Sequence, residues 1–362
     1  MNDFKAEHRA LRDAMLAAAA RVLDSGWYIL GPELAAFERR WADACGTAFC
    51  AGAANGMDAI ELVLRALDIG PGSEVVTTPM TAYATVLAIV RAGAVPVLAD
   101  IDAETGLLDP ASVKRCLSPR TRAVVLVHLY GRVERMEDWQ RLCEEAKVHL
   151  VEDCAQAHGA RWNGKVAGSF GVAGAYSFYP TKNLGALGDG GAVVSSDPAL
   201  VERIRCLRNY GQQQRYLHTM IGMNSRLDEL QAALLSVRLD WLDSFTSQRR
   251  KVAACYRQGI VNPRVRTLRA GIQEQADVHH LFVILCERRD ELQAHLKAHD
   301  VQTLVHYPIP MHRQPPLLTV QRDANGLTRA QTHADHCLSL PCHPQLSDED
   351  VAKVIDAVNS FS

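Results

Sequence analysis

The sequence of 362 residues lacks a long hydrophobic run, a compact group of cysteines and a surplus of one charge. Without a long apolar run, no segment is a candidate for a membrane-spanning helix. The ten cysteines are scattered from Cys45 to Cys342, which argues against a disulfide scaffold and predicts reduced thiols in the cytoplasm. A formal net charge of −2 provides no electrostatic footprint for nucleic acid or for an acidic membrane surface.

Internal repeats and low-complexity segments are absent as well. Near the N-terminus, charged residues stand on both sides of the alanine run 17–20, a pattern that predicts an amphipathic surface helix and not a signal peptide. Hydrophobic residues make up 48% and charged residues 22% of the chain, as in ordinary folded proteins. The length is sufficient for one large domain with a smaller one attached.

Short apolar runs alternate with helical patterns over the first two-thirds of the chain. Asn55 is suited to cap a helix, and the run 123–129 is apolar on both faces, as in a strand inside a parallel sheet. In chain order the predicted elements are a helix over 57–67, strand 74–77, helix 85–91, strand 95–98, a helix opened by Asp109 and Pro110, strand 123–129, helix 134–146 and strand 148–151. This alternation predicts an α/β fold with a mostly parallel sheet covered by helices.

The last third of the chain has a different pattern. A long helix is predicted to run from Leu227 towards Tyr256, followed by a strand over 280–286 and a helix over 290–299. These elements indicate a small α+β domain. We therefore assign residues 1–250 to a large α/β domain and residues 251–362 to a small C-terminal α+β domain.

Two carboxylates directly follow a predicted strand, at the edge where open α/β sheets bind their ligands. The strand over 148–151 leads straight into Glu152 and Asp153. Burying a carboxylate there costs free energy unless a cationic group pairs with it. A helix cap or a salt bridge would explain the same pattern.

A lysine and a small-residue turn complete the set. Lys182 follows an apolar run on a turn broken by Pro180 and Gly185, where a desolvated amine would have a lowered pKa and could attack a carbonyl. A solvated surface lysine is the alternative. The turn 52–57 opens a helix whose N-terminus could bind phosphate, although such helix starts are common. A cofactor with a phosphate, a pyridinium nitrogen and an aldehyde requires all three features.

Motifs along nearly the whole chain resemble those of the DegT/StrS family of sugar aminotransferases, which belong to the fold-type I enzymes that use pyridoxal 5′-phosphate (PLP). The matching segments are 26–33 (GWYILGPE), 69–76 (IGPGSEVV), 128–131 (HLYG), 152–160 (EDCAQAHGA), 177–191 (SFYPTKNLGALGDGG), 222–231 (GMNSRLDELQ) and 306–315 (HYPIPMHRQP). The two central segments are the most specific. The resemblance implies a fold-type I α/β large domain and a small α+β domain.

The resemblance also implies roles for single residues. Lys182 would hold PLP covalently and shuttle the proton of the reaction, while Asp153 would pair with the ring nitrogen. Further cofactor contacts would come from the amides of Gly56 and Met57, the hydroxyl of Ser177, and the side chains of Gln156, Tyr83 and Asn224. Family members usually have threonine at position 57, and the stretch 79–85 is about one residue shorter than usual, which shifts the alignment around Tyr83.

In the family, the residue that matches Asn224 reaches the phosphate of the neighbouring subunit, which implies a homodimer with shared active sites. Ser225 and Asp228 have capping-box spacing, so Asn224 could instead simply precede a helix. The residues that would contact the substrate are Arg215, Tyr216, His218, His306 and Tyr307. Each of them could equally be a satisfied surface or interface residue.

The implied reaction transfers an amino group from an amino acid, by family habit L-glutamate, to a nucleotide-linked 3- or 4-keto-sugar. Lys182 distinguishes this chain from the family's sugar dehydratases, which have histidine at that position. A keto-cyclitol acceptor is an alternative, as is a non-catalytic regulatory protein with the same fold. We expect no metal site at His333, His336, Cys337, Cys342 and His343, because their spacing fits no regular zinc pattern.

Overall fold

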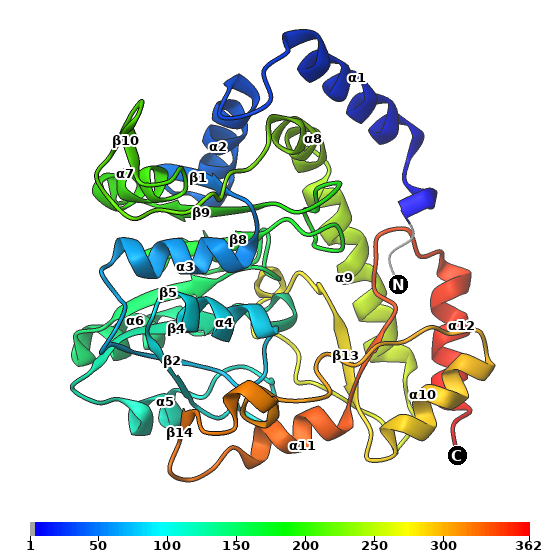
Figure 1. Cartoon of the computed structure of the whole chain (residues 1–362). Coiled ribbons are helices and arrows are strands. Elements are labelled where there is room, and N and C mark those ends of the chain that lie inside the picture. Colours follow the sequence, from blue (N-terminus) through cyan, green and yellow to red (C-terminus); the bar gives the residue numbers. More distant parts are fainter. Residues whose placement is uncertain (1–3) are drawn as a thin grey trace.

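The computed structural model describes residues 4–362. Its centre is an eight-stranded sheet with the strand order β1-β9-β8-β5-β4-β2-β3-β14 (Figure 1). The strands are β1 (Phe49–Ala53), β2 (Glu74–Thr77), β3 (Val95–Leu98), β4 (Thr121–Val127), β5 (His149–Asp153), β8 (Ala173–Ser177), β9 (Gly191–Ser195) and β14 (Gln321–Arg322). From β8 to β14 all neighbours are parallel, whereas β9 is antiparallel to both β8 and β1. The predicted α/β fold with a mostly parallel sheet is confirmed.

Helices cover both faces of this sheet because successive side chains of a strand point to opposite sides. Val75 packs with one hydrophobic core and its neighbour Val76 with the other. The helices of the Val75 face are α3 (Gly56–Ala66), α4 (Tyr83–Arg91) and α7 (Pro198–Leu207); those of the Val76 face are α2 (Pro32–Cys45), α5 (Pro110–Cys116), α6 (Met136–Ala146) and α8 (Glu229–Leu239).

The N-terminal helix is α1 (Arg9–Ser25), which packs against α8. Its buried residues Leu11, Met15, Ala18 and Val22 recur with helical spacing, so the predicted amphipathic surface helix is confirmed. Within residues 4–362, no helix combines the length and the apolar character that a membrane crossing requires.

The long helix predicted after Leu227 is wrong in one respect, because the chain forms two helices there. Helix α8 ends at Leu239, Asp240 accepts a hydrogen bond from Arg40 at 2.5 Å, and α9 runs over Leu242–Gly259. The break lets α8 pack on the large sheet and α1, while α9 contributes to the core of the small domain. No glycine or proline marks the break between the two helices. Both helices have apolar periodicity, so the pattern reads as one long helix.

The small domain contains a three-stranded antiparallel sheet of β12 (Arg266–Thr267), β13 (Phe282–Leu285) and β15 (Cys337–Leu340). Helices α9, α10 (Arg289–Ala298) and α12 (Asp348–Asn359) pack with this sheet around its core. The segment 311–327 returns to the large sheet through β14, and helix α11 (Thr328–His336) follows. Because α9 spans residue 250, the boundary between domains 1–250 and 251–362 stays a prediction.

Two short hairpins and five short 3-10 helices complete the described elements. They are β6 (Arg161–Trp162), β7 (Lys165–Val166), β10 (Gln212–Gln214) and β11 (Leu217–His218), with η1 (Phe4–Ala6), η2 (Leu129–Gly131), η3 (Glu274–Ala276), η4 (Met311–Arg313) and η5 (Pro315–Leu317). The β10–β11 hairpin projects from the body of the molecule beyond α7 (Figure 1).

Candidate active site

The two carboxylates at the end of β5 face opposite sides of the sheet, as alternation along a strand requires. Asp153 is 5% exposed and accepts hydrogen bonds from the Thr85 hydroxyl at 2.8 Å and from the amide of Ala155 at 3.1 Å. Burial raises the pKa of Asp153 above its ordinary value. Among residues 4–362 no cationic group forms a hydrogen bond with this buried carboxyl. A cationic group of a ligand could therefore pair with it.

Lys182 lies on the loop between β8 and β9. The loop is held closed by hydrogen bonds from the amide of Phe178 to the carbonyl of Gly190 and from the amide of Ala186 to the carbonyl of Phe178, both 2.7 Å. Asn183 anchors it further, because its side-chain amide donates to the carbonyl of Val278 at 3.0 Å. The side chain of Lys182 is half-buried, and desolvation lowers its pKa to about 8, although the charge of Asp153 acts in the opposite direction. The surface-lysine interpretation is therefore wrong.

Three histidines share the electrostatic environment of Lys182. Burial and, to a smaller extent, the positive charge of Lys182 lower the pKa of His158 to about 3 and that of His306 to about 4. The pKa of His280 is lowered for the same two reasons. At neutral pH these imidazoles are uncharged, so they leave the charge of Asp153 uncompensated. The predicted site included His306 but missed His158, although it stands in the matching segment 152–160, and His280, which had no local signal beyond its residue type.

The N-terminus of α3 abuts the end of β8. The Asn55 side chain caps the helix by accepting from the amide of Asp58 at 2.8 Å, as predicted. A Cβ on Gly56 would lie 2.6 Å from the Cβ of Ser177, so only glycine permits this close approach. The amides of Gly56 and Met57 belong to the first helical turn, whose N–H groups have no acceptor within the helix. The structure therefore brings Gly56, Met57 and Ser177 together in a cradle suited to phosphate.

Gln156 connects the large domain to the segment that carries His306 and Tyr307. Its side-chain oxygen accepts from the amide of Tyr130 at 2.6 Å, and its nitrogen donates to the hydroxyl of Tyr307 at 3.1 Å. Burial raises the pKa of Tyr307 to about 12, and the charge of Asp153 contributes to this rise. His306 and Tyr307 thus join the site from the small domain, 124 and more residues after Lys182 by their numbering.

Tyr83 and Asn224 are exposed. Tyr83 begins α4, two residues before the Thr85 that binds Asp153, and is 37% exposed. Asn224 adjoins Ser225, whose hydroxyl accepts from the amide of Ala54 at 3.1 Å beside the phosphate cradle. The capping box at Ser225 is not formed, because the cap of α8 is Asp228 and makes no side-chain cap bond. The cofactor contacts of Tyr83 and Asn224 stay predictions.

The polar residues of the β10–β11 hairpin lie apart from Lys182 in this chain. The guanidinium of Arg215 stands 5.1 Å from the centre of the Tyr216 ring, and Tyr216 is 81% exposed. His218 bonds through Nδ1 to the carbonyl of Tyr210 at 3.0 Å. Within the described residues, the hydrogen bonds and ring contacts of these three side chains involve other residues than those of the Lys182 loop. Their predicted role towards a neighbouring subunit's substrate is not tested by these contacts.

The histidines and cysteines near the C-terminus have separate partners. His333 bonds to the hydroxyl of Tyr130, Cys337 contacts the carbonyl of His306, and Cys342 contacts the carbonyls of Arg249 and His279. These residues are close in sequence but have different partners, because helix α11 and strand β15 direct successive side chains to different surroundings.

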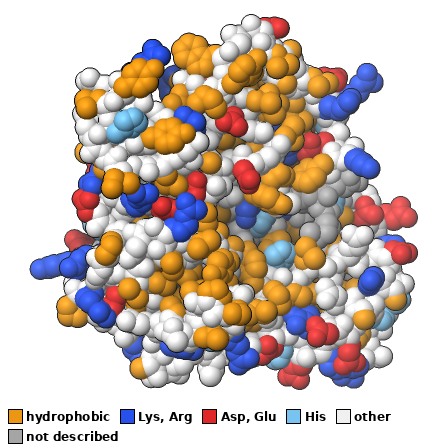
Figure 2. All heavy atoms as spheres, viewed as in Figure 1, with side chains coloured by type: hydrophobic (Ala, Val, Ile, Leu, Met, Phe, Trp, Pro, Cys, Tyr) orange, Lys and Arg blue, Asp and Glu red, His pale blue; other side chains and the backbone are white. Residues whose placement is uncertain are grey.

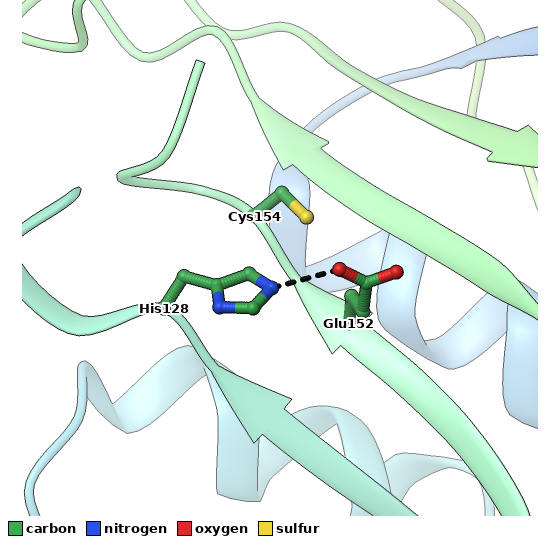
Figure 3. Close-up of side chains that lie close together, drawn as sticks. All are labelled: His128, Glu152 and Cys154. Carbon is green, nitrogen blue, oxygen red and sulfur yellow. Dashed lines mark hydrogen bonds and ion pairs between the residues drawn. The ribbon is translucent and has the colours of Figure 1, made fainter. Parts of the chain in front are cut away.

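A different trio converges on the Val76 face of the sheet, where His128, Glu152 and Cys154 lie together (Figure 3). Glu152 is fully buried and bonds to Nε2 of His128 at 2.8 Å. The same carboxylate also accepts from the amides of Gly168, Phe170 and Gly171, at 2.7 and 2.8 Å. Burial holds the pKa of the Cys154 thiol well above its ordinary value, so the sulfur stays protonated. We therefore assign the trio to anchoring the loop 168–171, since the carboxylate oxygens already have protein donors.

Comparison with known proteins adds the family. The model of the DegT/DnrJ/EryC1/StrS aminotransferase family matches residues 10–359. The chain belongs to this family. A dTDP-3-amino-3,4,6-trideoxy-alpha-D-glucose transaminase from Streptomyces venezuelae is 46% identical over 360 residues, which are 99% of this chain and 95% of the relative.

Solved structures agree with this assignment. The crystal structure of DesV from S. venezuelae has a TM-score of 0.95 at 46% identity and covers 99% of this chain and 96% of its own. NtdA from Bacillus subtilis, solved with bound cofactor PMP, has a TM-score of 0.89 at 26% identity, with 98% and 82% covered. The protein is a PLP-dependent aminotransferase, and the predicted family, fold and cofactor are confirmed.

Proposed function

We propose that this aminotransferase transfers an amino group from L-glutamate to a nucleotide-linked 3-keto-sugar. The main observation behind this proposal is the half-buried amine of Lys182, which has a pKa of about 8 and shares its surroundings with the buried Asp153. The transaminase from S. venezuelae, whose name specifies a dTDP-linked 3-amino sugar, supports the acceptor class and the carbon position. The reaction takes place in the cytoplasm, in a homodimer.

The side chains fit the cofactor in shape and in charge. The amides of Gly56 and Met57 and the hydroxyl of Ser177 would hold its phosphate, beside the close contact that only glycine permits at position 56. Asp153 would pair with the ring nitrogen, whose proton supplies the cationic partner that the buried carboxyl otherwise lacks. Gln156 and Tyr83 would lie beside the ring. When bound, the cofactor supplies an aldehyde for amines and a ring that takes up an electron pair.

Lys182 has two tasks in this proposal. Its amine would hold the cofactor, and it would also move the proton at the reacting carbon of the substrate. A pKa of about 8 leaves roughly a tenth of the amine neutral at pH 7, which suits a group that must both accept and return a proton. The neutral imidazoles of His158 and His306 preserve the electrostatic influence of Asp153 on this amine.

The acceptor would bind between this site and the neighbouring subunit. His306 and Tyr307 would contact the sugar from the small domain, since Tyr307 already bonds to Gln156. Arg215, Tyr216 and His218 would extend over the partner's site, and the exposure and projection of their hairpin support this reach (Figure 1).

The exposed apolar surface supports the homodimer. Tyr179 and Leu187, which lie on the Lys182 loop, are 52% and 56% exposed, and Ile221 near Asn224 is 88% exposed. Figure 2 shows hydrophobic side chains on the upper part of the molecule, where Figure 1 places α1, α2 and α8, and also across its centre. Large apolar side chains beside a reactive lysine favour a covering partner.

The decisive experiment combines purified, PLP-loaded protein with L-glutamate and a panel of acceptors. The panel contains dTDP-linked 3-keto and 4-keto hexoses and a keto-cyclitol, and mass spectrometry identifies aminated products. We expect amination of the 3-keto sugar, its loss in the Lys182→Ala variant, and its retention in Lys165→Ala, which changes an exposed lysine. If the keto-cyclitol is the only compound turned over, the acceptor is a keto-cyclitol and not a nucleotide-linked sugar. If no acceptor is turned over although the cofactor band near the visible edge is present, the regulatory alternative is favoured.

A further inference from the structure

A cleft of about 630 Å³ lies beside the small domain. Its walls come from β12, the turn after β13, helix α11 and the loop after β3. None of the residues predicted to contact cofactor or substrate lines it. The proposed transamination therefore does not use this cleft.

The cleft is rich in guanidinium groups. Arg264, Arg266, Arg288 and Arg329 line it, together with a single acid, Glu287. Because a guanidinium offers five N–H donors and no acceptor, four of them in one cleft present a wall of donors. Arginine forks match the oxygens of phosphate in geometry as well as in charge.

Three of these arginines have acidic partners, which fix their positions without using all their donors. Arg266 pairs with Glu104 at 3.0 Å, and Arg288 with Glu291 at 2.5 Å. Arg329 pairs with Asp109 at 2.6 Å. In the part of the chain that the structure describes, Arg264 has no ion pair. The cleft thus retains unused N–H donors, and among the described residues the guanidinium of Arg264 is the one in the lining without an ion pair.

The ring of His333 contributes a group of the opposite kind. His333 lines the cleft and is 3% exposed. The hydroxyl of Tyr130 donates its one hydrogen to the carbonyl of His306 at 2.6 Å, so it must accept from Nε2 of His333 at 2.9 Å. Nδ1 therefore has a lone pair, and this buried atom has no hydrogen-bond partner within residues 4–362. An unpaired buried acceptor is unfavourable, and a hydrogen bond donated by a ligand hydroxyl would remove this cost.

We propose that this cleft binds a small phosphorylated molecule that has a free hydroxyl group. Its phosphate contacts the arginines, with Arg264 and Arg266 as the principal partners, and its hydroxyl donates to Nδ1 of His333. The site is distinct from the Lys182 site, and its existence does not depend on the sugar acceptor proposed above.

The test is a titration of the PLP-loaded protein, followed by ³¹P NMR, with two matched probes. Glycerol 3-phosphate has hydroxyl groups and propyl phosphate has none. We expect saturable binding of both, with glycerol 3-phosphate bound at least about fivefold more tightly, as one added hydrogen bond provides. Equal affinities would overturn the role of His333.

Variants assign the binding to the cleft. The Arg264→Gln/Arg266→Gln variant should weaken the binding of glycerol 3-phosphate at least about tenfold. The Arg9→Gln/Arg141→Gln variant changes the net charge equally at two exposed positions and should bind normally. Absence of saturable binding, binding unchanged by the cleft variant, or equal weakening in both variants would overturn the proposal. Aminotransferase activity should be the same in both variants.

Discussion

Glu152 and Asp153 are adjacent carboxylates at the end of one strand, and their surroundings give them different tasks. Glu152 receives hydrogen bonds from three backbone amides and from His128 (Figure 3). Asp153 receives one from Thr85 and one from an amide, and burial raises its pKa. Because the first carboxyl is saturated by the protein and the second is not, Asp153 is the one available to a cofactor.

The anchoring role of Glu152 predicts a stability defect. In the Glu152→Gln variant, an amide NH₂ group replaces one acceptor oxygen and faces backbone N–H donors. We expect the free energy of unfolding to fall by about 2–4 kcal/mol, because buried donors lose their partner. Urea denaturation of the apoprotein measures this. Glu145→Gln, on the exposed side of α6, is the control and should unfold as the parent does; equal stability of both variants would rule out the anchor.

The pKa of Lys182 predicts how cofactor capture depends on pH. Burial lowers this pKa from 10.5 to about 8, and only the neutral amine attacks an aldehyde. The rate at which the apoenzyme combines with PLP should therefore rise about tenfold per pH unit below pH 8 and level off above it. Stopped-flow absorbance measures this rate. A free lysine derivative is the control, because its rate of combination with PLP should continue to rise above pH 8.

The same profile tests the influence of Asp153. Its negative charge raises the pKa of Lys182, so the Asp153→Asn variant should reach its plateau at a lower pH than the parent. A rate that continues to rise beyond pH 9 in the parent would show that the amine is not desolvated.

The contact between β9 and the N-terminus of α3 determines the shape of the phosphate cradle. A Cβ on Gly191 would lie 2.4 Å from the backbone carbon and oxygen of Asn55, and neither element can yield easily. In the Gly191→Ala variant we expect a stability loss of about 1–3 kcal/mol from overpacking, with a weaker affinity for PLP as α3 is displaced.

A neighbouring glycine provides the control for this prediction. A Cβ on Gly188 would meet only the flexible end of the Gln231 side chain, at 3.3 Å. Gly188→Ala should therefore keep both stability and cofactor affinity close to those of the parent, as measured by thermal unfolding and by titration with PLP. If the two variants behave alike, the close contact does not shape the cradle.

For the whole molecule, the proposed homodimer predicts complementation between two inactive variants. Lys182→Ala removes the amine from one subunit, and Asn224→Ala would remove the phosphate contact that this subunit offers its partner. If Asn224 acts across the interface, a mixed dimer contains one site with both defects and one intact site. Equal mixing should then restore about a quarter of the parental activity, because half of the dimers are mixed and each has one working site.

Coexpression of the two variants with different tags allows the mixed dimer to be isolated and assayed. Each variant alone serves as the baseline, and sedimentation measures the oligomeric state. If the mixed dimer is no more active than the average of the Lys182→Ala and Asn224→Ala dimers, Asn224 acts within its own subunit.

The predicted site residues separate into those with a local signal and those without one. The positions of Lys182 and Asp153 followed from a turn and a strand end, and the Asn55 cap followed from residue type. Thr85 and His280 could not be assigned in this way, because their contacts with Asp153 and with the Lys182 environment join distant parts of the chain. Periodicity reports which face of an element is apolar and does not report which polar groups meet.

The sequence by itself determined the alternation of strands and helices and the family motifs, and it predicted Lys182 and Asp153 as site residues, because each of these signals depends on residues close together in the chain. The tertiary structure alone decided the break between α8 and α9, the return of β14 to the large sheet, and the arginine-lined cleft. Each of these depends on packing between segments far apart in sequence, where burial and charge are set by neighbours that no local pattern identifies.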